Sequence, residues 1–203
     1  GFNVQFISET QLKVLKKLAP TAAKLSGRNI DKTLNKLESL MKLKRGEPTN
    51  DFLPSVHYKL TSLPDDNDFT QLERNNVGLI WLAPIAPAKG EHAVTVSKIV
   101  SSVLAKFNIE SAISMTLLTP QTIDCVISLL YDRRIEGADE TAESCHNTLV
   151  KTLSDAGYLF YRFNSFQHRD FADLYRTDMS KLLKRWKEDV DPNQVLAGGR
   201  YGL

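Results

Sequence analysis

The sequence predicts an α+β domain with a mixed, largely antiparallel sheet and helices covering one face. Five segments have the short apolar or alternating pattern of strands, namely Phe2–Ile7, Val77–Ala83, Ala112–Leu118, Ile123–Asp132 and Tyr158–Phe163. Longer segments between them repeat apolar residues every three or four positions, which is typical of helices. Two of the strands follow each other directly, which favours antiparallel pairing over an all-parallel sheet.

Start and stop signals delimit the expected helices. Ser8 and Gln11 form a capping-box pattern before the first helix, which Pro20 should end or interrupt. Asn29 should cap the second helix. Two further helices are expected at 90–107 and 138–156, the latter closed by Gly157. Thr177 should cap the last helix, which Asp191-Pro192 ends.

The remaining segments are expected to be irregular. The stretch Thr49–Asn76 reads as a long loop with one short strand near Val56–Leu60. Pro84 and Pro87 should end the strand that runs to Ala83.

Composition excludes several classes of partner. The 203 residues carry a net charge of +2 with acidic and basic side chains well mixed, which does not favour nucleic acid or an anionic membrane. The apolar run Val77–Pro87 is too short to span a bilayer. Two cysteines without CxxC spacing and four dispersed histidines predict no metal site and no disulfide scaffold. A cytoplasmic location is therefore favoured, although the compartment is not fixed.

Several catalytic signatures are missing from the sequence. There is no GxGxxG, no GxxxxGK[ST], no HExxH and no GxSxG. This segment therefore encodes neither a dinucleotide-binding turn nor a P-loop.

Four segments, taken in order, carry a family resemblance. They are Gly78–Gly90 (GLIWLAPIAPAKG), Ile113–Asp132, Ala156–Arg162 (AGYLFYR) and the tail Trp186–Gly202 (WKEDVDPNQVLAGGRYG). Together they resemble the C-terminal, substrate-covering part of the vanillyl-alcohol oxidase and p-cresol methylhydroxylase family of FAD-linked oxidoreductases. The resemblance covers Val77 to Leu203, and residues 1–76 fit only by the order of their elements.

The resemblance implies a phenolate site. Tyr161 and Arg162 take the place of the pair that holds the substrate's phenolate oxygen. A phenol with a pKa of about 10 is neutral at pH 7, and a guanidinium with a hydroxyl donor stabilises its anion. Strand alternation alone offers another interpretation, with Tyr161 packed and Arg162 in solvent.

Two further residues are implied by the resemblance. Asp124 falls at the family's active-site histidine and is expected to act as a base or a hydrogen-bond acceptor, or simply to cap the turn before a strand. Arg200 falls where relatives place a basic residue against flavin or substrate, with a solvated tail arginine as the alternative.

The implied cofactor is FAD in the full-length protein, held mainly by a flavin-binding domain outside this segment. Leu79 stands at the family's flavin-linking histidine, and Pro64–Ile80 contains neither His nor Tyr, so no covalent link is expected here. Residues 1–176 should form the substrate cap, and residues 177–203 a helix and Gly-rich tail that packs on the flavin domain. Because Gly1 is not Met and a strand pattern begins at once, the chain is expected to be a piece of a longer protein and inactive alone.

The leading hypothesis for function is oxidation of a 4-alkylphenol or aromatic alcohol by hydride transfer to FAD. A small aromatic substrate, a second copy of the chain and a cytochrome c acceptor are the candidate partners. Two alternatives stay open: an FAD-linked oxidase of a hydroxy acid or other alcohol, and a non-enzymatic α+β domain that binds a ligand or partner.

Overall fold

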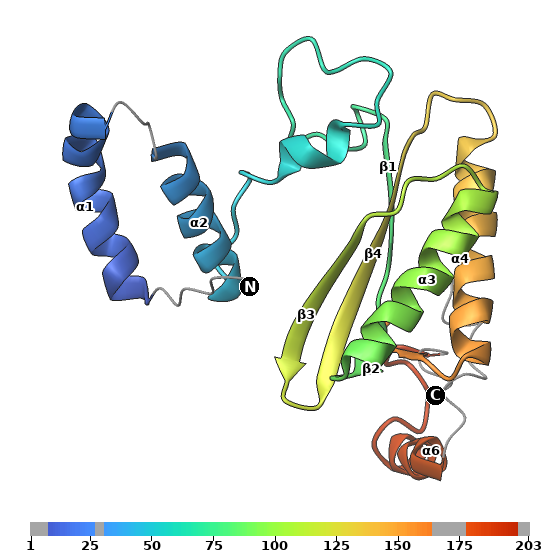
Figure 1. The fold of residues 1–203 in the computed structure, drawn as a ribbon. Helices are drawn as coiled ribbons and strands as arrows, with labels where there is room; N and C mark the ends of the chain where they lie inside the picture. Colours follow the sequence, from blue (N-terminus) through green and yellow to red (C-terminus); the bar gives the residue numbers. More distant parts are fainter. Residues whose placement is uncertain (1–7, 27–30, 164–177, 199–203) are drawn as a thin grey trace. The chain divides into compact units, whose positions relative to one another are not determined.

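The computed structural model describes residues 8–26, 31–163 and 178–198. The chain divides into two compact units, one of residues 1–58 with 64–71 and one of residues 59–63 with 72–203. Each unit is considered by itself below (Figure 1). None of the helices in the described segments is long and apolar enough to cross a membrane.

The first unit is built on a pair of helices, α1 (Glu9–Ser26) and α2 (Asp31–Lys44), followed by a 3-10 helix at Leu53–His57. The predicted capping box is present, because the Ser8 N–H donates to Gln11 Oε1 (2.8 Å) and the Gln11 N–H donates to Ser8 Oγ (3.3 Å). Leu12 and Leu34 are buried between the helices with Met41 against them. An ion pair between Lys16 and Glu38 also joins the helices.

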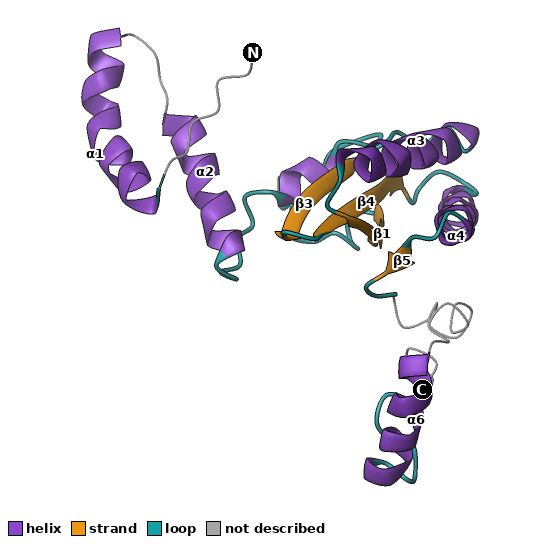
Figure 2. Cartoon of the chain, turned by 60° about the horizontal axis from the view of Figure 1, so that its bottom comes forward, coloured by secondary structure: helices purple, strands orange, loops and turns teal. Residues whose placement is uncertain are grey.

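The second unit contains one antiparallel sheet and two covering helices. Its elements are β1 (Val77–Leu82), β2 (Pro84–Pro87), α3 (Gly90–Lys106), β3 (Ile113–Thr119), β4 (Thr122–Asp132), α4 (Ala138–Asp155) and β5 (Leu159–Phe160). On one side β4 pairs with β3, and on the other side with β1 and β2; β2 then pairs with β5. Both helices lie on one face of the sheet (Figure 2). This is a split βαβ arrangement, and it confirms the predicted fold class.

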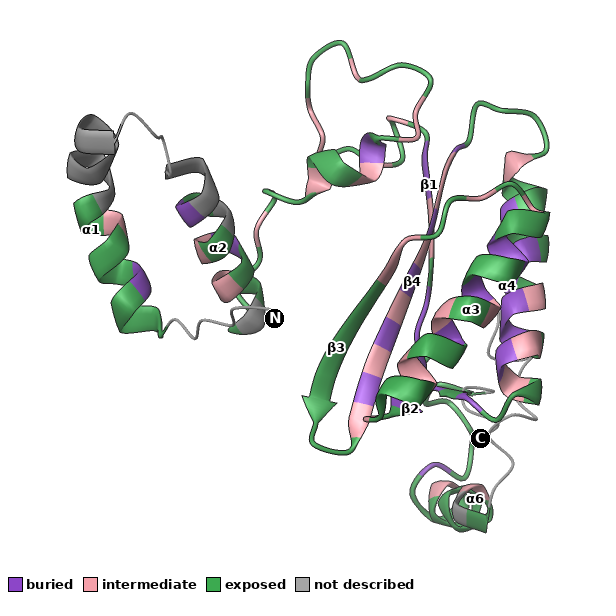
Figure 3. Cartoon of the chain, in the orientation of Figure 1, coloured by how far each residue is buried: buried purple, intermediate pink, exposed green. Residues whose placement is uncertain are grey.

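The core lies between β4 and the two helices. Alternate residues of β4 point to this side and are fully buried, and they pack with apolar residues of α3 and α4: Cys125, Ile127, Leu129, Val96, Val100, Leu104, Cys145, Leu149 and Leu153. The intervening residues of β4 are only half-buried (Figure 3). Period-two alternation in the sequence therefore corresponds to one covered face and one open face.

A buried carboxylate fastens the end of β4. Asp132 Oδ2 accepts hydrogen bonds from the Thr61 N–H and hydroxyl, both at 2.8 Å, and Asp132 pairs with Arg134. Arg134 also donates to Ser62 Oγ at 2.6 Å. The Arg134 guanidinium holds the pKa of Asp132 well below its usual range. This network anchors residues 61–62 to the sheet.

A second carboxylate shapes the C-terminal segment after α6 (Asp178–Val190). Asp191 Oδ1 accepts the Val195 N–H at 3.0 Å, Asp191 Oδ2 accepts the Leu196 N–H at 3.0 Å, and Lys187 pairs with Asp191. The predicted turn at Asp191-Pro192 is thus held by the aspartate itself.

Two local expectations were wrong, and a third was incomplete. The expected break at Pro84 is present, because β1 ends at Leu82, but the chain does not leave the sheet there. The partners of Leu82 and Ile85 on β4 are Ile127 and Asp124, so β2 continues the register of β1. The ladder is interrupted there because proline has no N–H to donate. The strand expected near Val56–Leu60 is instead the 3-10 helix.

The second wrong expectation concerns Pro20, since α1 continues through it to Ser26. A proline removes only one helical hydrogen bond, and the rest of the helix can persist. The predicted strand Phe2–Ile7 and the predicted caps Asn29 and Thr177 lie outside the described residues. Because residues 164–177 do too, the domain boundary at 176/177 stays a prediction.

Candidate functional site

The site begins where the chain leaves the sheet after β5. β5 ends at Phe160 and the chain bends at Tyr161, whose N–H still donates to the Ala83 carbonyl at 3.4 Å. Because the strand ends here, Tyr161 and Arg162 are not forced onto opposite faces of a sheet.

Tyr161 and Arg162 lie together in the structure. The guanidinium carbon of Arg162 lies 5.1 Å from the centre of the Tyr161 ring, within the range of a cation–π contact. Both side chains are exposed.

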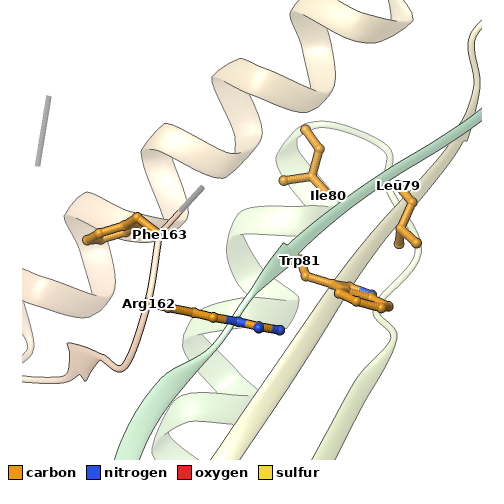
Figure 4. A pocket seen from close by; sticks show the side chains of 5 residues that line it. All are labelled: Leu79, Ile80, Trp81, Arg162 and Phe163. Carbon is orange, nitrogen blue, oxygen red and sulfur yellow. The ribbon is translucent and has the colours of Figure 1, made fainter. Parts of the chain in front are cut away.

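A pocket of about 330 Å³ adjoins this bend. It is lined by Leu79, Ile80 and Trp81 of β1 and by Arg162 and Phe163 (Figure 4). Three consecutive residues of one strand can line a pocket only along the strand's edge. β1 pairs with β4 alone among the described strands, so this edge is open.

The pocket combines an apolar wall with one cation. Figure 4 shows Leu79 and Trp81 on one side of β1, and the Arg162 side chain extending toward the strand near Trp81. The Trp81 side chain is 57% exposed, which is unusual for an aromatic residue in a strand. The sequence prediction missed Trp81, although alternation places it on the same face as Leu79.

Asp124 lies within β4 on the open face, opposite Ile85 of β2 and Thr116 of β3. The alternative that it caps a turn before a strand is therefore wrong. Its Oδ1 atom is buried without a hydrogen-bond partner among the described residues. Burial raises the pKa of Asp124, and the charge of Arg162 lowers it in part.

The other candidates are less informative. Arg200 lies outside the described residues. The thiols of Cys125 and Cys145 are fully buried, and burial raises the pKa of each, which does not suit a nucleophile. In the described part of the chain, no three His, Cys, Asp or Glu side chains are grouped as metal ligands.

The pocket does not fit a whole FAD molecule. Its volume is at the lower end of the range for small-ligand sites, which suits a single aromatic ring.

Sequence comparisons identify two related enzymes. The chain is 27% identical to 1'-carboxy-chondrochloren decarboxylase of Chondromyces crocatus over 198 residues, which cover 98% of this chain and 36% of that protein. It is 33% identical to the 4-cresol dehydrogenase [hydroxylating] flavoprotein subunit of Pseudomonas putida over 131 residues, which cover 64% of this chain and 25% of that subunit. The chain thus spans about a third or less of either relative. No protein-family model matches.

Comparison with solved structures identifies enzymes of the same kind. p-Cresol methylhydroxylase with substrate bound matches 62% of this chain with a TM-score of 0.57 and 31% sequence identity, over 24% of its own length. A 4-ethylphenol oxidase from Gulosibacter chungangensis matches 86% of this chain with a TM-score of 0.64 over 31% of its own length, and at 18% identity it supports the fold alone. The chain is therefore homologous to the 4-cresol dehydrogenase flavoprotein subunit, and over the matched part it has the fold of the p-cresol methylhydroxylase family.

Proposed function

We propose that this chain is the substrate-covering part of a flavin-dependent oxidoreductase that oxidises a 4-alkylphenol or a related aromatic alcohol. The observation that carries the proposal is Arg162, whose guanidinium extends into a pocket of single-ring size beside Trp81 and over Tyr161. The homology to the 4-cresol dehydrogenase flavoprotein subunit supports this assignment.

In this proposal, Arg162 and Tyr161 hold the substrate oxygen as a phenolate. A guanidinium presents several N–H donors and a fixed positive charge, so it stabilises the anion more than the neutral phenol. The charge of the phenolate moves into the ring and makes loss of hydride from the para-alkyl carbon easier. FAD, when bound, supplies the hydride acceptor.

Asp124 is the proposed acceptor of the phenol's proton. Its buried Oδ1 has no hydrogen-bond partner among the residues described, so it remains available to a donor. Burial raises the pKa of Asp124, which favours the protonated carboxyl once the proton has arrived.

FAD is proposed to bind mainly outside this segment and without a covalent link through it. Leu79 lines the pocket with an aliphatic side chain, which cannot form such a bond. A cytochrome c acceptor and a flavin-binding domain of the same protein remain proposed partners. Acid precipitation of the full-length enzyme should release the flavin from any peptide that contains residues 64–80.

Binding of 4-nitrophenol to the 203-residue chain tests the phenolate site without flavin. Its anion is yellow and its neutral form is not, so absorbance reports ionisation directly. Wild-type chain should bind the yellow anion and lower the pKa of the bound phenol. Arg162→Ala should abolish this shift in pKa. Arg162→Lys should restore only part of it, because an ammonium group lacks the planar pair of donors of a guanidinium.

Arg185→Ala removes an exposed arginine from α6 and is the matched control. If Arg162→Ala binds the anion as tightly as wild type does, the phenolate role is wrong, whereas the homology stands.

A second candidate is oxidation coupled to decarboxylation. The decarboxylase relative matches 98% of this chain, including residues that the 4-cresol dehydrogenase match does not reach. Hydride loss from the benzylic carbon gives a quinone methide. Loss of CO₂ from the neighbouring carbon then restores the phenolate and leaves an alkene. Release of CO₂ from a 3-(4-hydroxyphenyl)propanoate-type substrate by the full-length enzyme would favour this candidate over simple alkylphenol oxidation.

A further inference from the structure

The short strand that leads to Tyr161 and Arg162 is weakly held by its backbone. β5 has only two residues, and one of its two partners on β2 is Pro84. Because proline has no N–H, it cannot donate a hydrogen bond to this ladder. The next backbone contact, from the Tyr161 N–H to the Ala83 carbonyl, is long at 3.4 Å. Backbone pairing alone therefore does not fix the direction in which the chain presents Arg162.

Buried aromatic side chains hold the same segment from the helix-covered side. Tyr158, Phe160 and Phe163 are buried, whereas Tyr161 and Arg162 are exposed. The ring centroids of Phe160 and Phe163 lie 5.2 Å apart. Burial of apolar rings keeps the segment on the sheet, but it has little directional preference. A directional contact is needed to fix the orientation of the two exposed side chains.

Tyr158, which directly precedes β5, makes such a contact. Its hydroxyl lies 3.0 Å from His92 Nδ1, and the two rings meet edge to face with 5.8 Å between their centroids. His92 belongs to the first turn of α3, whose Val96 and Val100 are fully buried in the core. The Tyr158 N–H also donates to the Leu153 carbonyl of α4 at 3.0 Å. Tyr158 thus connects the start of β5 to both covering helices.

We propose that His92 and Tyr158 are positioning residues for the phenolate site, because their hydrogen bond fixes the start of β5 to α3 and so sets the direction in which Arg162 enters the pocket. This role rests on the proposed function, in which Arg162 holds the substrate oxygen. Neither His92 nor Tyr158 lines the pocket, so both act through the backbone that leads to Arg162. Hydrogen bonds to an ion weaken when they are misaligned, so loss of the anchor should weaken binding of the phenolate.

Variants of the two residues remove the bond from either side. Tyr158→Phe removes the hydroxyl and keeps the buried ring. Because His92 is only half-buried, its ring nitrogen can then bond to water, and the fold should persist. His92→Phe removes the other partner, and the double variant should be no worse than either single variant if both residues act through one bond. His92→Asn, whose amide can take the place of Nδ1, should restore part of the loss.

Nuclear magnetic resonance of the Arg162 side chain tests its position without a ligand. The guanidinium carbon lies 5.1 Å from the centre of the Tyr161 ring, so the ring current should shift the side-chain proton signals upfield. Tyr158→Phe should move these signals toward the values of an unstructured arginine. Thr61→Val removes a hydroxyl hydrogen bond to Asp132 at the other end of β4 and is the matched control, which should leave the signals unchanged.

Binding of 4-nitrophenol tests the consequence for the phenolate site. Tyr158→Phe should reduce the preference of the 203-residue chain for the yellow anion over the neutral phenol by about threefold to tenfold. Thr61→Val should keep the wild-type preference. A hydrogen bond with a purely structural role would lower the thermal stability of either variant and leave the anion preference unchanged.

Two results would overturn the proposal. In one, Tyr158→Phe leaves the Arg162 signals at their wild-type positions; in the other, the signals move but a wild-type anion preference is retained. If the wild-type chain shows no anion preference, the proposed phenolate role is wrong, and the Arg162 signals alone decide whether His92 and Tyr158 position this arginine.

Discussion

Leu129 and Leu130 are neighbours in β4 with the same side chain, but they lie in opposite surroundings. Leu129 is fully buried against the helices, whereas Leu130 is half-buried on the open face opposite Leu79. The covered face holds the packed core of the unit. The open face and its edge hold Asp124, Trp81 and Tyr161, the residues with exposed or unsatisfied polar groups. The difference indicates that the candidate site occupies the face that contributes less to stability.

The largest expected effect is on the covered face. Leu129→Ala should lower the free energy of unfolding by about 3–4 kcal/mol, because it leaves a cavity that the packed core around it can fill only in part. Leu130→Ala should lower it by about 1 kcal/mol, since solvent already reaches that side chain. Urea unfolding of the two variants measures the contrast, and equal losses would show that something also covers the open face.

Removal of the buried Asp132 network should cause the next largest loss of stability. Asp132→Ala removes the acceptor of Thr61 and Arg134 and should lower the free energy of unfolding by about 3 kcal/mol. Because the pKa of Asp132 is depressed in the folded state, its contribution is present above the unfolded pKa of about 4. It is lost as pH falls through the lower folded pKa.

The stability difference between wild type and Asp132→Ala should therefore narrow as the pH falls below about 4. Thermal unfolding from pH 7 to pH 3 measures this trend. A difference that widened in acid would contradict the assignment of Asp132 as an ionised anchor.

Substitutions at Gly78 and Tyr131 should have smaller, coupled effects on the free energy of unfolding. A Cβ on residue 78 would lie 2.3 Å from Tyr131 Cε2, so the ring must move. That movement would disturb the hydrogen bond between Tyr131 and Asp139. Burial, together with this hydrogen bond, raises the pKa of Tyr131 to about 12. Gly78→Ala should lower the free energy of unfolding by about 1–3 kcal/mol.

A double-mutant cycle isolates this contact. In a Tyr131→Ala background, Gly78→Ala should have almost no effect, because the clashing ring is gone. An unchanged penalty in that background would mean that the backbone of β1, and not the ring, needs glycine at residue 78.

Elements with a regular hydrophobic periodicity were predictable from the sequence. Elements that depend on pairing with segments distant in the sequence were not. Alternation in β4 and the apolar stripes of α3 and α4 are local patterns, and the structure confirms them. β2 was missed because its two prolines disfavour a strand, whereas pairing on both sides with β4 and β5 holds it in the sheet. A strand was expected near Val56–Leu60, but Leu53–His57 forms a 3-10 helix instead.

The candidate site was only partly predictable for the same reason. Tyr161 and Arg162 were identified by resemblance. The pocket depends on the open edge of β1, which follows from how β5 pairs with β2 rather than with β1. No local pattern in the sequence contains that information, so the contribution of Trp81 was invisible before the strands were placed.

The smallest expected effect on stability, at Trp81, should accompany a clear effect on binding. Trp81→Ala should change the free energy of unfolding by about 0.5 kcal/mol or less, since more than half of the side chain is exposed at 57%. The same change removes the aromatic wall of the pocket beside Arg162. Stacking on an aromatic ring contributes about 1 kcal/mol, so affinity for 4-nitrophenol should fall three- to tenfold. Trp81→Phe should keep most of the affinity, and Leu159→Ala, on the same face but outside the pocket, should keep all of it. If Trp81→Ala lowered stability strongly and left binding unchanged, Trp81 would be a packing residue and the open edge of β1 would not be the binding site.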